Sequence, residues 1–402
     1  PTPPTAKGRA NPLADADTMA TRETSHPSLA QKRPRSDYKQ KRKTFHTEGG
    51  SNAAKRHTVR TPHHGTISYV EALSGESTEV PSGHENSKDS AMTVLFLHGI
   101  QGSARSFRLQ LERFSDTEFA PIRVLAMDLP GYGETDSIPP PKLGSDNEDR
   151  EKDRFPLHDF SHIGPYYADA VVALLDALSV SCLSMLVGHS MGGLVAQLFA
   201  DRHPLRLERL VISSSYVGDG RSACSDVLDS KWTMRLRDLR NLPPKQYGLA
   251  RAKGMVADPE ALDSAAAVEE LASIAAEVTS VGLRGGCNLL HVADTTDALK
   301  QIRLLQMCRA STSSLTKVLV LIGERDKVVT AEQSRAVMQI LSSSSPGNDA
   351  DASAGSVDSH GISELQCMMV TFPSVAHAAY IEDAEAYNRA LADFLKDSKE
   401  SV

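Results

Sequence analysis

The chain has 402 residues and a formal net charge of −7, but its charges are unevenly distributed. Positions 1–64 hold 13 basic and 5 acidic residues, whereas positions 65–402 hold 31 basic and 46 acidic residues. This acidic balance argues against nucleic-acid binding through the larger part, because DNA and RNA backbones are anionic. A hydrophobic content of 40% is enough for a sizeable core.

Cysteine usage and hydropathy indicate an intracellular protein. The five cysteines are an odd number without paired spacing, which is typical of reduced thiols. No run reaches the roughly 18 apolar residues that a membrane span needs, and the first 30 residues lack the apolar block of a secretory signal. We therefore expect a cytoplasmic protein without a membrane span.

Positions 1–64 are predicted to be a disordered basic segment. They are rich in Pro, Thr, Ser, Lys and Arg and lack apolar periodicity, so they bury too little surface to offset the entropy of ordering. A split basic cluster, Lys32–Arg35 and Lys39–Lys43, is compatible with a nuclear or organellar address. The segment could contact an import receptor or an anionic surface. A solvated tail without such a contact is an equally good interpretation.

Short, continuous apolar runs follow from Ser68 onward and predict strands buried on both faces, as in a parallel sheet covered by helices. These runs are 93–97, 122–127, 183–187, 210–212, 318–322 and 368–372. A helical stretch that ends near Pro204 separates the third run from the fourth, which is a βαβ pattern.

The expected domain organisation is a core in two parts with a cap between them. The core would occupy 65–216 and 317–402, and the mainly helical segment 217–316 would lie over the sheet as a cap. Two polar inserts, 139–153 and 342–363, are predicted to be mobile or disordered surface loops.

Gly188-His189-Ser190-Met191-Gly192 carries the strongest chemical signal. It follows an apolar strand-like run and precedes a helical run. A sharp turn between strand and helix strains the backbone and exposes a serine hydroxyl, while the flanking glycines allow the two elements to approach closely. We predict that Ser190 is a nucleophile.

A serine nucleophile needs a base, which a carboxylate must in turn orient. Asp326 and His377 each follow directly after a strand-like run, where catalytic groups collect in open α/β sheets. The order Ser190, Asp326, His377 is the order of serine α/β-hydrolases. Asp219, which follows another strand, is the alternative acid.

Attack on a carbonyl creates an oxyanion that needs two preorganised N–H donors. We predict that the backbone amides of Met191, directly after the nucleophile, and Ile100, in the loop 98–102, supply them. Gln101, beside Ile100, is a predicted substrate-binding residue.

Five ordered motifs together resemble the α/β-hydrolase superfamily: His98-Gly99, Asp128 to Gly133, Gly188 to Gly193, Gly323 to Asp326, and Ala376-His377 with Tyr380 to Glu382. Within the superfamily, the sequence is similar to the cap-bearing branch that contains 3-oxoadipate enol-lactonase, carboxylesterases and carbon–carbon bond hydrolases. This resemblance covers about residues 65–397. It implies an α/β-hydrolase fold with an eight-stranded, mostly parallel sheet, helices on both faces and a helical cap, and no metal or organic cofactor. Ala376 departs from the Gly that many relatives have there.

The resulting hypothesis is a serine hydrolase that cleaves a small carboxylic ester or lactone through an acyl-enzyme on Ser190. Ile100, Gln101, Met191 and the cap would set substrate choice, with Trp232 as a wall of the pocket. An acyltransferase with the same three residues and a catalytically silent binding protein are the alternatives.

Overall fold

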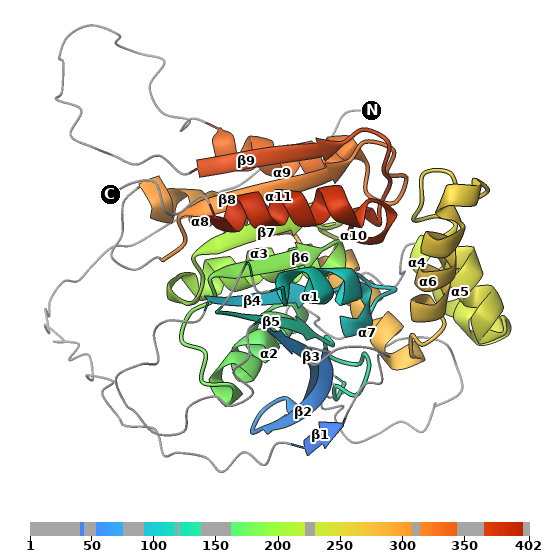
Figure 1. Ribbon diagram of the computed structural model, residues 1–402, viewed down its shortest axis with the longest axis horizontal. Helices are drawn as coiled ribbons and strands as arrows, with labels where there is room; N and C mark the ends of the chain where they lie inside the picture. Colours follow the sequence, from blue (N-terminus) through green and yellow to red (C-terminus); the bar gives the residue numbers. More distant parts are fainter. Residues whose placement is uncertain are drawn as a thin grey trace, which may run out of the picture. The chain divides into compact units, whose positions relative to one another are not determined.

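A computed structural model describes residues 41–43, 54–74, 92–116, 118, 121–137, 162–221, 230–307, 314–343 and 366–396. At the centre of this part of the chain is one twisted sheet of nine strands, in the order β1-β2-β3-β5-β4-β6-β7-β8-β9 (Figure 1). The strands are β1 (Lys41–Lys43), β2 (Lys55–Thr61), β3 (Gly65–Leu73), β4 (Met92–Leu97), β5 (Ile122–Met127), β6 (Met185–His189), β7 (Arg209–Ser213), β8 (Lys317–Gly323) and β9 (Gln366–Phe372). Strands β1, β2 and β3 pair antiparallel, and β3 joins β5 antiparallel. All pairs from β5 to β9 are parallel.

The inner parallel strands β4 to β8 are mainly apolar because both of their faces are buried. In β4, Leu95 and Leu97 contribute to one hydrophobic core, whereas Val94 and Phe96 contribute to a second core on the opposite face. Successive strand residues point to opposite faces, so a strand that supplies two cores cannot alternate apolar with polar residues.

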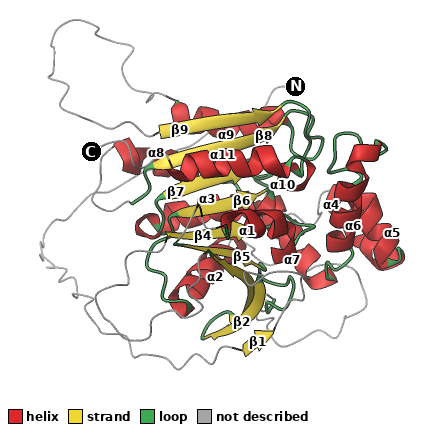
Figure 2. Ribbon diagram, viewed as in Figure 1, coloured by secondary structure: helices red, strands yellow, loops and turns green. Residues whose placement is uncertain are grey.

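Helices cover both faces of the sheet (Figure 2). The first core includes side chains from α2 (Ile163–Ala177), α3 (Met191–Arg202), α8 (Thr296–Met307) and α9 (Ala331–Ser342). The second includes side chains from α1 (Arg108–Phe114), the short α10 (Ala379–Glu382) and α11 (Ala384–Lys396). The expected α/β-hydrolase architecture is therefore confirmed.

The cap consists of α4 (Ser230–Asn241), α5 (Pro244–Ala252) and α6 (Ala265–Ala275), and α7 (Ser280–Val292) connects it to the core. These helices lie beyond the carboxyl ends of the parallel strands (Figure 1). Helices α5 and α6 approach each other so closely that a Cβ at Gly248 would collide with the carbonyl of Ala272. The segment 217–316, expected as cap, also contains α8, which packs against α3 and α9 of the core instead.

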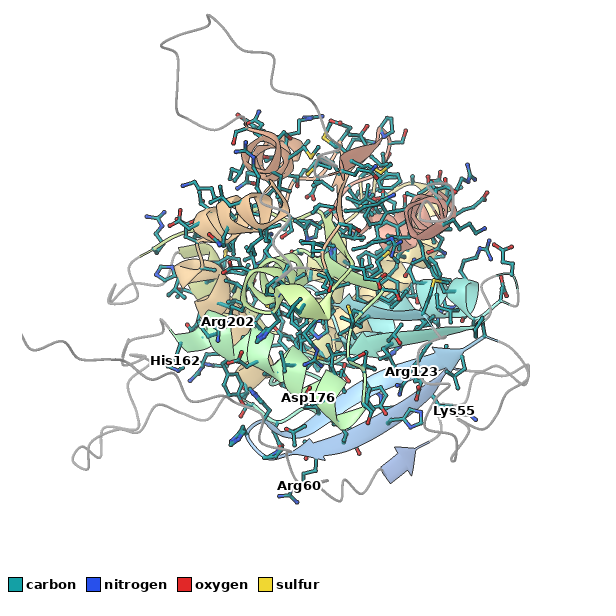
Figure 3. All side chains as sticks on the ribbon, turned by 90° about the vertical axis from the view of Figure 1, so that its left-hand side faces the viewer. Lys55, Arg60, Arg123, His162, Asp176 and Arg202 are labelled. Atoms are coloured by element: carbon teal, nitrogen blue, oxygen red, sulfur yellow. The ribbon has the colours of Figure 1, made fainter. Side chains whose placement is uncertain are left out.

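The amino-terminal edge of the sheet corrects the sequence prediction. Segment 1–64, predicted to be disordered, contains β1 and β2, and the sheet has nine strands when the three-residue β1 is included. Residues 1–40 and 44–53 of this segment lie outside the described residues. Lys55 and Arg60 of β2 point outward (Figure 3), but Arg56 is buried and forms an ion pair with Asp128. Because a charged residue occupies a buried position of β2, a search for apolar runs does not predict this strand.

The remaining predicted segments lie mainly outside the described residues. These are the basic cluster at 32–35, the insert at 139–153 and positions 344–363 of the second insert. Among the helices that the structure describes, none is both long and apolar enough to cross a membrane.

Candidate active site

Ser190 lies at a strained turn between β6 and α3. Its backbone has φ 54° and ψ −117°, a region that residues with a Cβ rarely adopt. Hydrogen bonds hold it there: its amide donates to the Ser213 carbonyl at 2.9 Å, and its own carbonyl accepts from the Ser215 hydroxyl at 2.7 Å. The predicted strand–turn–helix setting of Ser190 is thus present.

The glycines on either side of this turn are required by close backbone approach. A Cβ at Gly188 would collide with the carbonyl of Gly192, and a Cβ at Gly192 would collide with the carbonyl of Leu97 at the end of β4. The motif therefore packs the start of α3 against two neighbouring strands, β6 and β4. Only glycine fits at either position without displacing the backbone.

His377 and Asp326 form a hydrogen-bonded pair. Asp326 follows β8 and His377 follows β9, and these strands are neighbours in the sheet. The Asp326 Oδ2 and His377 Nδ1 atoms are 2.7 Å apart, and both side chains are almost fully buried. The other carboxylate oxygen, Oδ1, accepts from the amides of Val328 at 2.7 Å and Val329 at 3.0 Å. Hydrogen bonds therefore fix both oxygens of the Asp326 carboxylate, one of them against the imidazole.

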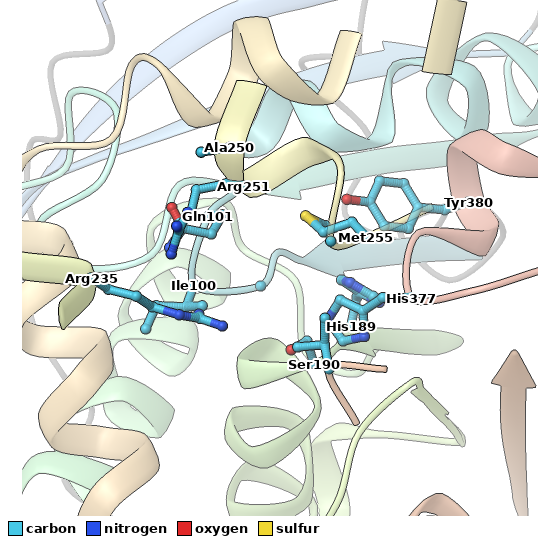
Figure 4. Close-up of a pocket in the computed structure, with 14 residues that line it drawn as sticks. Ile100, Gln101, His189, Ser190, Arg235, Ala250, Arg251, Met255, His377 and Tyr380 are labelled. Carbon is cyan, nitrogen blue, oxygen red and sulfur yellow. The ribbon is translucent and has the colours of Figure 1, made fainter. Parts of the chain in front are cut away.

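Ser190 and His377 line one cavity of about 210 Å³ between the cap and the carboxyl ends of the strands (Figure 4). Its core side is formed by residues from the loop after β4, the serine turn and the loops after β8 and β9. Its cap side is formed by Arg235 of α4, Ala250 and Arg251 of α5, and Met255 just beyond α5. The structure thus brings the serine and the Asp326-oriented histidine to the same enclosed space.

The two amides predicted to bind an oxyanion lie beside the serine. Met191 is the first residue of α3, and Ile100 lines the cavity. Gly99 is so close that a Cβ there would be 3.2 Å from the Cβ of Ser190. Within the described part of the chain, neither the Met191 nor the Ile100 amide donates a hydrogen bond. First-turn helix amides such as that of Met191 have no intrahelical acceptor, so it can serve a ligand.

One predicted substrate-binding residue lines the cavity and the other does not. Gln101 lines it, and its Oε1 accepts from the hydroxyl of Tyr247, a cap residue, at 2.9 Å. Trp232 is buried in the first core instead, so its prediction as a wall of the pocket is corrected. Arg235, one turn further along α4, lines the cavity in its place, with its guanidinium 5.0 Å from the centre of the indole ring.

Sequence reasoning also missed the aromatic surroundings of His377, in which His189 is in contact with both His377 and Tyr380. The His189 ring lies 4.7 Å from the His377 ring and 4.7 Å from the Tyr380 ring, measured between centroids. Burial holds the pKa of His189 well below its usual range, and the neighbouring His377 and His98 lower it further. A neutral His189 adds no positive charge beside His377. The position of His189 next to Ser190 in the motif 188–192 was the sequence signal that could have placed it near the site.

Asp219, the alternative acid, is held elsewhere. It accepts hydrogen bonds from the Tyr216 hydroxyl at 3.0 Å and from the Trp232 indole at 3.4 Å, and it does not line the cavity. The geometry favours Asp326. Among the residues that the structure describes, no group of three or more His, Cys, Asp or Glu side chains is arranged to hold a metal ion.

Comparisons with known proteins agree with this fold. Human epoxide hydrolase 4 is 30% identical over 119 residues, which cover 30% of this chain and 26% of the human protein. The match thus spans about a quarter of that relative. The enol-lactonase of Burkholderia xenovorans LB400 superposes with a TM-score of 0.56 at 17% identity, covering 82% of this chain and 96% of its own. The esterase EaEST of Exiguobacterium antarcticum gives a TM-score of 0.57 at 14% identity, covering 84% and 98%.

At such low identities the two superpositions establish the fold alone. The sequence itself matches the family described as "Alpha/beta hydrolase family" over residues 94–390, which is most of the chain and includes all the motifs around the cavity. The chain therefore belongs to the alpha/beta hydrolase family.

Proposed function

We propose that this protein is a serine hydrolase that cleaves a carboxylic ester or lactone. The observation that carries the proposal is the strained Ser190 in the same cavity as His377, whose Nδ1 is hydrogen-bonded to Asp326. Strain of this kind costs about 1–3 kcal/mol and persists where the surroundings enforce it, commonly at functional sites.

In the proposed reaction, His377 Nε2 takes the proton of the Ser190 hydroxyl as Oγ attacks the substrate carbonyl. The oxyanion accepts hydrogen bonds from the Met191 and Ile100 amides. When the tetrahedral intermediate collapses, the carbon–oxygen bond breaks and the imidazolium protonates the leaving alkoxide. Water then attacks the acyl-enzyme with His377 again as base, releasing the acid and restoring Ser190. Asp326 stabilises the imidazolium in both steps.

Ser190 favours carbonyl substrates over epoxides, although epoxide hydrolases are among the relatives. A carboxylate nucleophile opens an epoxide to an ester, which water can cleave. A serine hydroxyl would instead form an alkyl ether, for which the site offers no route of hydrolysis. Attack on a carbonyl gives an acyl-enzyme, which the same imidazole can hydrolyse.

A fluorophosphonate probe, followed by mapping of the labelled peptide, tests the activated serine. We expect the wild type to be labelled at Ser190, and Ser190→Ala and His377→Ala to lose both labelling and turnover while remaining folded. Ser179→Ala is the matched control, because Ser179 also has a positive φ but is exposed and lies outside the cavity. Well-folded wild-type protein without labelling would contradict the proposal and favour a silent binding protein.

Product analysis separates hydrolysis from acyl transfer, which would use the same residues. Ester turnover is followed in water with and without an added alcohol or amine acceptor. We expect the free acid to dominate in both cases. Predominant transfer to the acceptor would assign the acyltransferase function instead.

A further inference from the structure

The cavity beside Ser190 carries positive charge that nothing in it balances. Arg235 of α4 and Arg251 of α5 line it from the cap, and no lining residue is acidic. Placing two guanidinium groups around one small, partly enclosed space is unfavourable, because like charges repel and burial removes water from them. A site of this kind is suited to a ligand that brings negative charge.

The two arginines differ in their partners. Arg251 forms an ion pair with Asp238 at 3.2 Å, so its charge is largely compensated. Arg235 has no hydrogen bond or ion pair with any other residue that the structure describes, and its guanidinium lies over the Trp232 ring. In Figure 4 its side chain enters the cavity from the side opposite His377 and points toward Ser190. Arg235 is thus the free cation of this cavity.

A second donor in the cavity is also unused. Gln101 is 7% exposed, and its Nε2 atom is buried without a hydrogen-bond partner, while its Oε1 is engaged by Tyr247. Leaving a buried donor unsatisfied costs about 1–3 kcal/mol. The Tyr247 bond fixes the orientation of the amide, because the oxygen must face the donating hydroxyl. The NH₂ group is therefore available to an acceptor on a ligand.

Arg235 keeps its charge in this position. Burial lowers its pKa from the usual value, and the nearby Arg251 lowers it further, while Cys287 and two tyrosines raise it. An arginine remains protonated at neutral pH despite such a shift. The Arg235 guanidinium is therefore charged and partly desolvated, and an anionic ligand would offset this unfavourable desolvation.

We propose that the substrate of the serine hydrolase carries a carboxylate, distinct from the scissile carbonyl, that binds to Arg235 and to the Gln101 Nε2. The assignment rests on the proposed function and narrows its substrate class to anionic esters or lactones. The planar guanidinium pairs with a carboxylate through two parallel hydrogen bonds. A single uncompensated cation matches the single charge of a carboxylate better than the nearly doubly charged phosphate.

Paired substrates test this assignment in turnover. The 4-nitrophenyl monoesters of glutaric and adipic acid are compared with their neutral methyl esters, with rates corrected for the enzyme-free reaction. We expect the wild type to prefer the acid by at least about tenfold in kcat/KM, the value of one charge-assisted hydrogen bond. Arg235→Gln should lose this preference and change turnover of the neutral ester much less. Arg237→Gln, on the exposed side of the same helix, is the matched control and should retain it.

Binding tests the subsite without requiring turnover. Glutarate, adipate and inorganic phosphate are titrated calorimetrically into Ser190→Ala protein with and without Arg235→Gln. We expect a dicarboxylate to bind at least about tenfold more weakly when Arg235 is replaced. Binding of phosphate alone, or dicarboxylate binding that is indifferent to Arg235, would overturn the inference.

The combined results distinguish the two proposals. Hydrolysis of both esters without an Arg235-dependent preference would refute the carboxylate subsite and leave the serine hydrolase in place. Arg235-dependent dicarboxylate binding to the Ser190→Ala protein, together with a folded wild type that is neither labelled nor active, would refute the hydrolase and leave the anion site in place.

Discussion

The Asp326 carboxylate engages the His377 imidazole with one oxygen and the backbone of its own loop with the other. The Oδ2 atom lies 2.7 Å from Nδ1, and Oδ1 accepts from two successive amides. Because both oxygens are engaged, the carboxylate cannot rotate away from the imidazole. Because a carboxylate oxygen accepts hydrogen bonds, Nδ1 is the donor in this pair, which in the proposed reaction leaves Nε2 to act as the base.

Asp326→Asn should abolish this control of the imidazole while keeping the fold. The asparagine oxygen can still accept from the loop amides, but its NH₂ group then faces Nδ1 and forces the proton onto Nε2. We expect kcat to fall by about 10³ to 10⁴-fold, as when a triad carboxylate is replaced by its amide. Steady-state turnover of a neutral 4-nitrophenyl ester measures the loss, and thermal unfolding monitors the fold.

Asp219→Asn provides the control for this prediction, since Asp219 is the other carboxylate that follows a strand. It binds Tyr216 and Trp232 outside the cavity, so its variant should retain kcat close to the wild-type value. If Asp219→Asn caused the larger loss of kcat, Asp326 would not be the orienting acid.

Replacing Ser190 should reveal the free energy stored in the turn. At φ 54° and ψ −117°, a residue with a Cβ is strained, whereas glycine adopts positive φ readily. We expect Ser190→Gly to be more stable than Ser190→Ala by about 1–3 kcal/mol, although both lack the nucleophile. Urea unfolding at equilibrium measures the difference.

The alanine variant isolates the strain from the loss of the hydroxyl. If Ser190→Gly were no more stable than Ser190→Ala, the strain at this turn would not exceed the entropic cost of ordering glycine, about 0.5–1 kcal/mol. The predicted difference of about 1–3 kcal/mol would then be wrong.

The residues around Ser190 could be predicted because of one topological rule. Ser190, Asp326 and His377 each follow an apolar run, and the carboxyl ends of parallel strands meet at one edge of a sheet. The apolar runs of β6 and β8 could be recognised because both faces of these strands are buried, and the run of β9 is apolar although much of this edge strand is exposed. Local sequence therefore placed three distant side chains at the same edge, although their catalytic roles remain predictions.

Arg235 and Arg56 could not be predicted in the same way. Arg235 lies in a highly charged helix whose sequence is typical of a solvated surface, and only the packing of α4 over the sheet turns it toward the cavity. Arg56 is a cation in a strand, and its partner, Asp128, is 72 residues away. In both cases a contact between distant segments decides whether the charge is buried.

Folding stability should depend on pH through two buried histidines near the site. Burial lowers the pKa of both His98 and His189 below the unfolded value of 6.5. The tautomer of His98 is also fixed: its Nε2 accepts from the Leu129 amide at 3.0 Å, and its Nδ1 lies 2.8 Å from the Gly99 carbonyl. Protonation of Nε2 would break the first of these bonds.

The sign of the pH effect follows from proton uptake. Below about pH 6.5 the unfolded chain binds protons at these positions that the folded protein excludes. We therefore expect the free energy of unfolding to keep its full value above that pH. On acidification it should fall by up to about 1.4 kcal/mol per pH unit for each histidine. Urea unfolding between pH 5 and 8 measures this slope.

His189→Gln separates the contribution of this histidine from all others. The variant removes one of the two excluded protons, so its stability should decline less steeply than that of the wild type as pH falls. Parallel curves for the two proteins would mean that His189 ionises equally in the folded and unfolded states.

The Tyr247 hydroxyl joins the cap to the loop after β4, because it donates to Gln101 across 146 residues of sequence. Tyr247→Phe keeps the ring but leaves the buried Gln101 oxygen without its donor. We expect a loss of about 1–3 kcal/mol in the free energy of unfolding.

The same substitution should also affect substrate binding. Since the Gln101 amide is then free to reorient, its Nε2 should no longer be held toward the ligand, and KM for a carboxylate-bearing ester should rise more than kcat falls. Tyr166→Phe, which removes a hydroxyl outside the cavity, is the matched control. Equal effects of the two substitutions on KM would show that the orientation of Gln101 does not contribute to substrate binding.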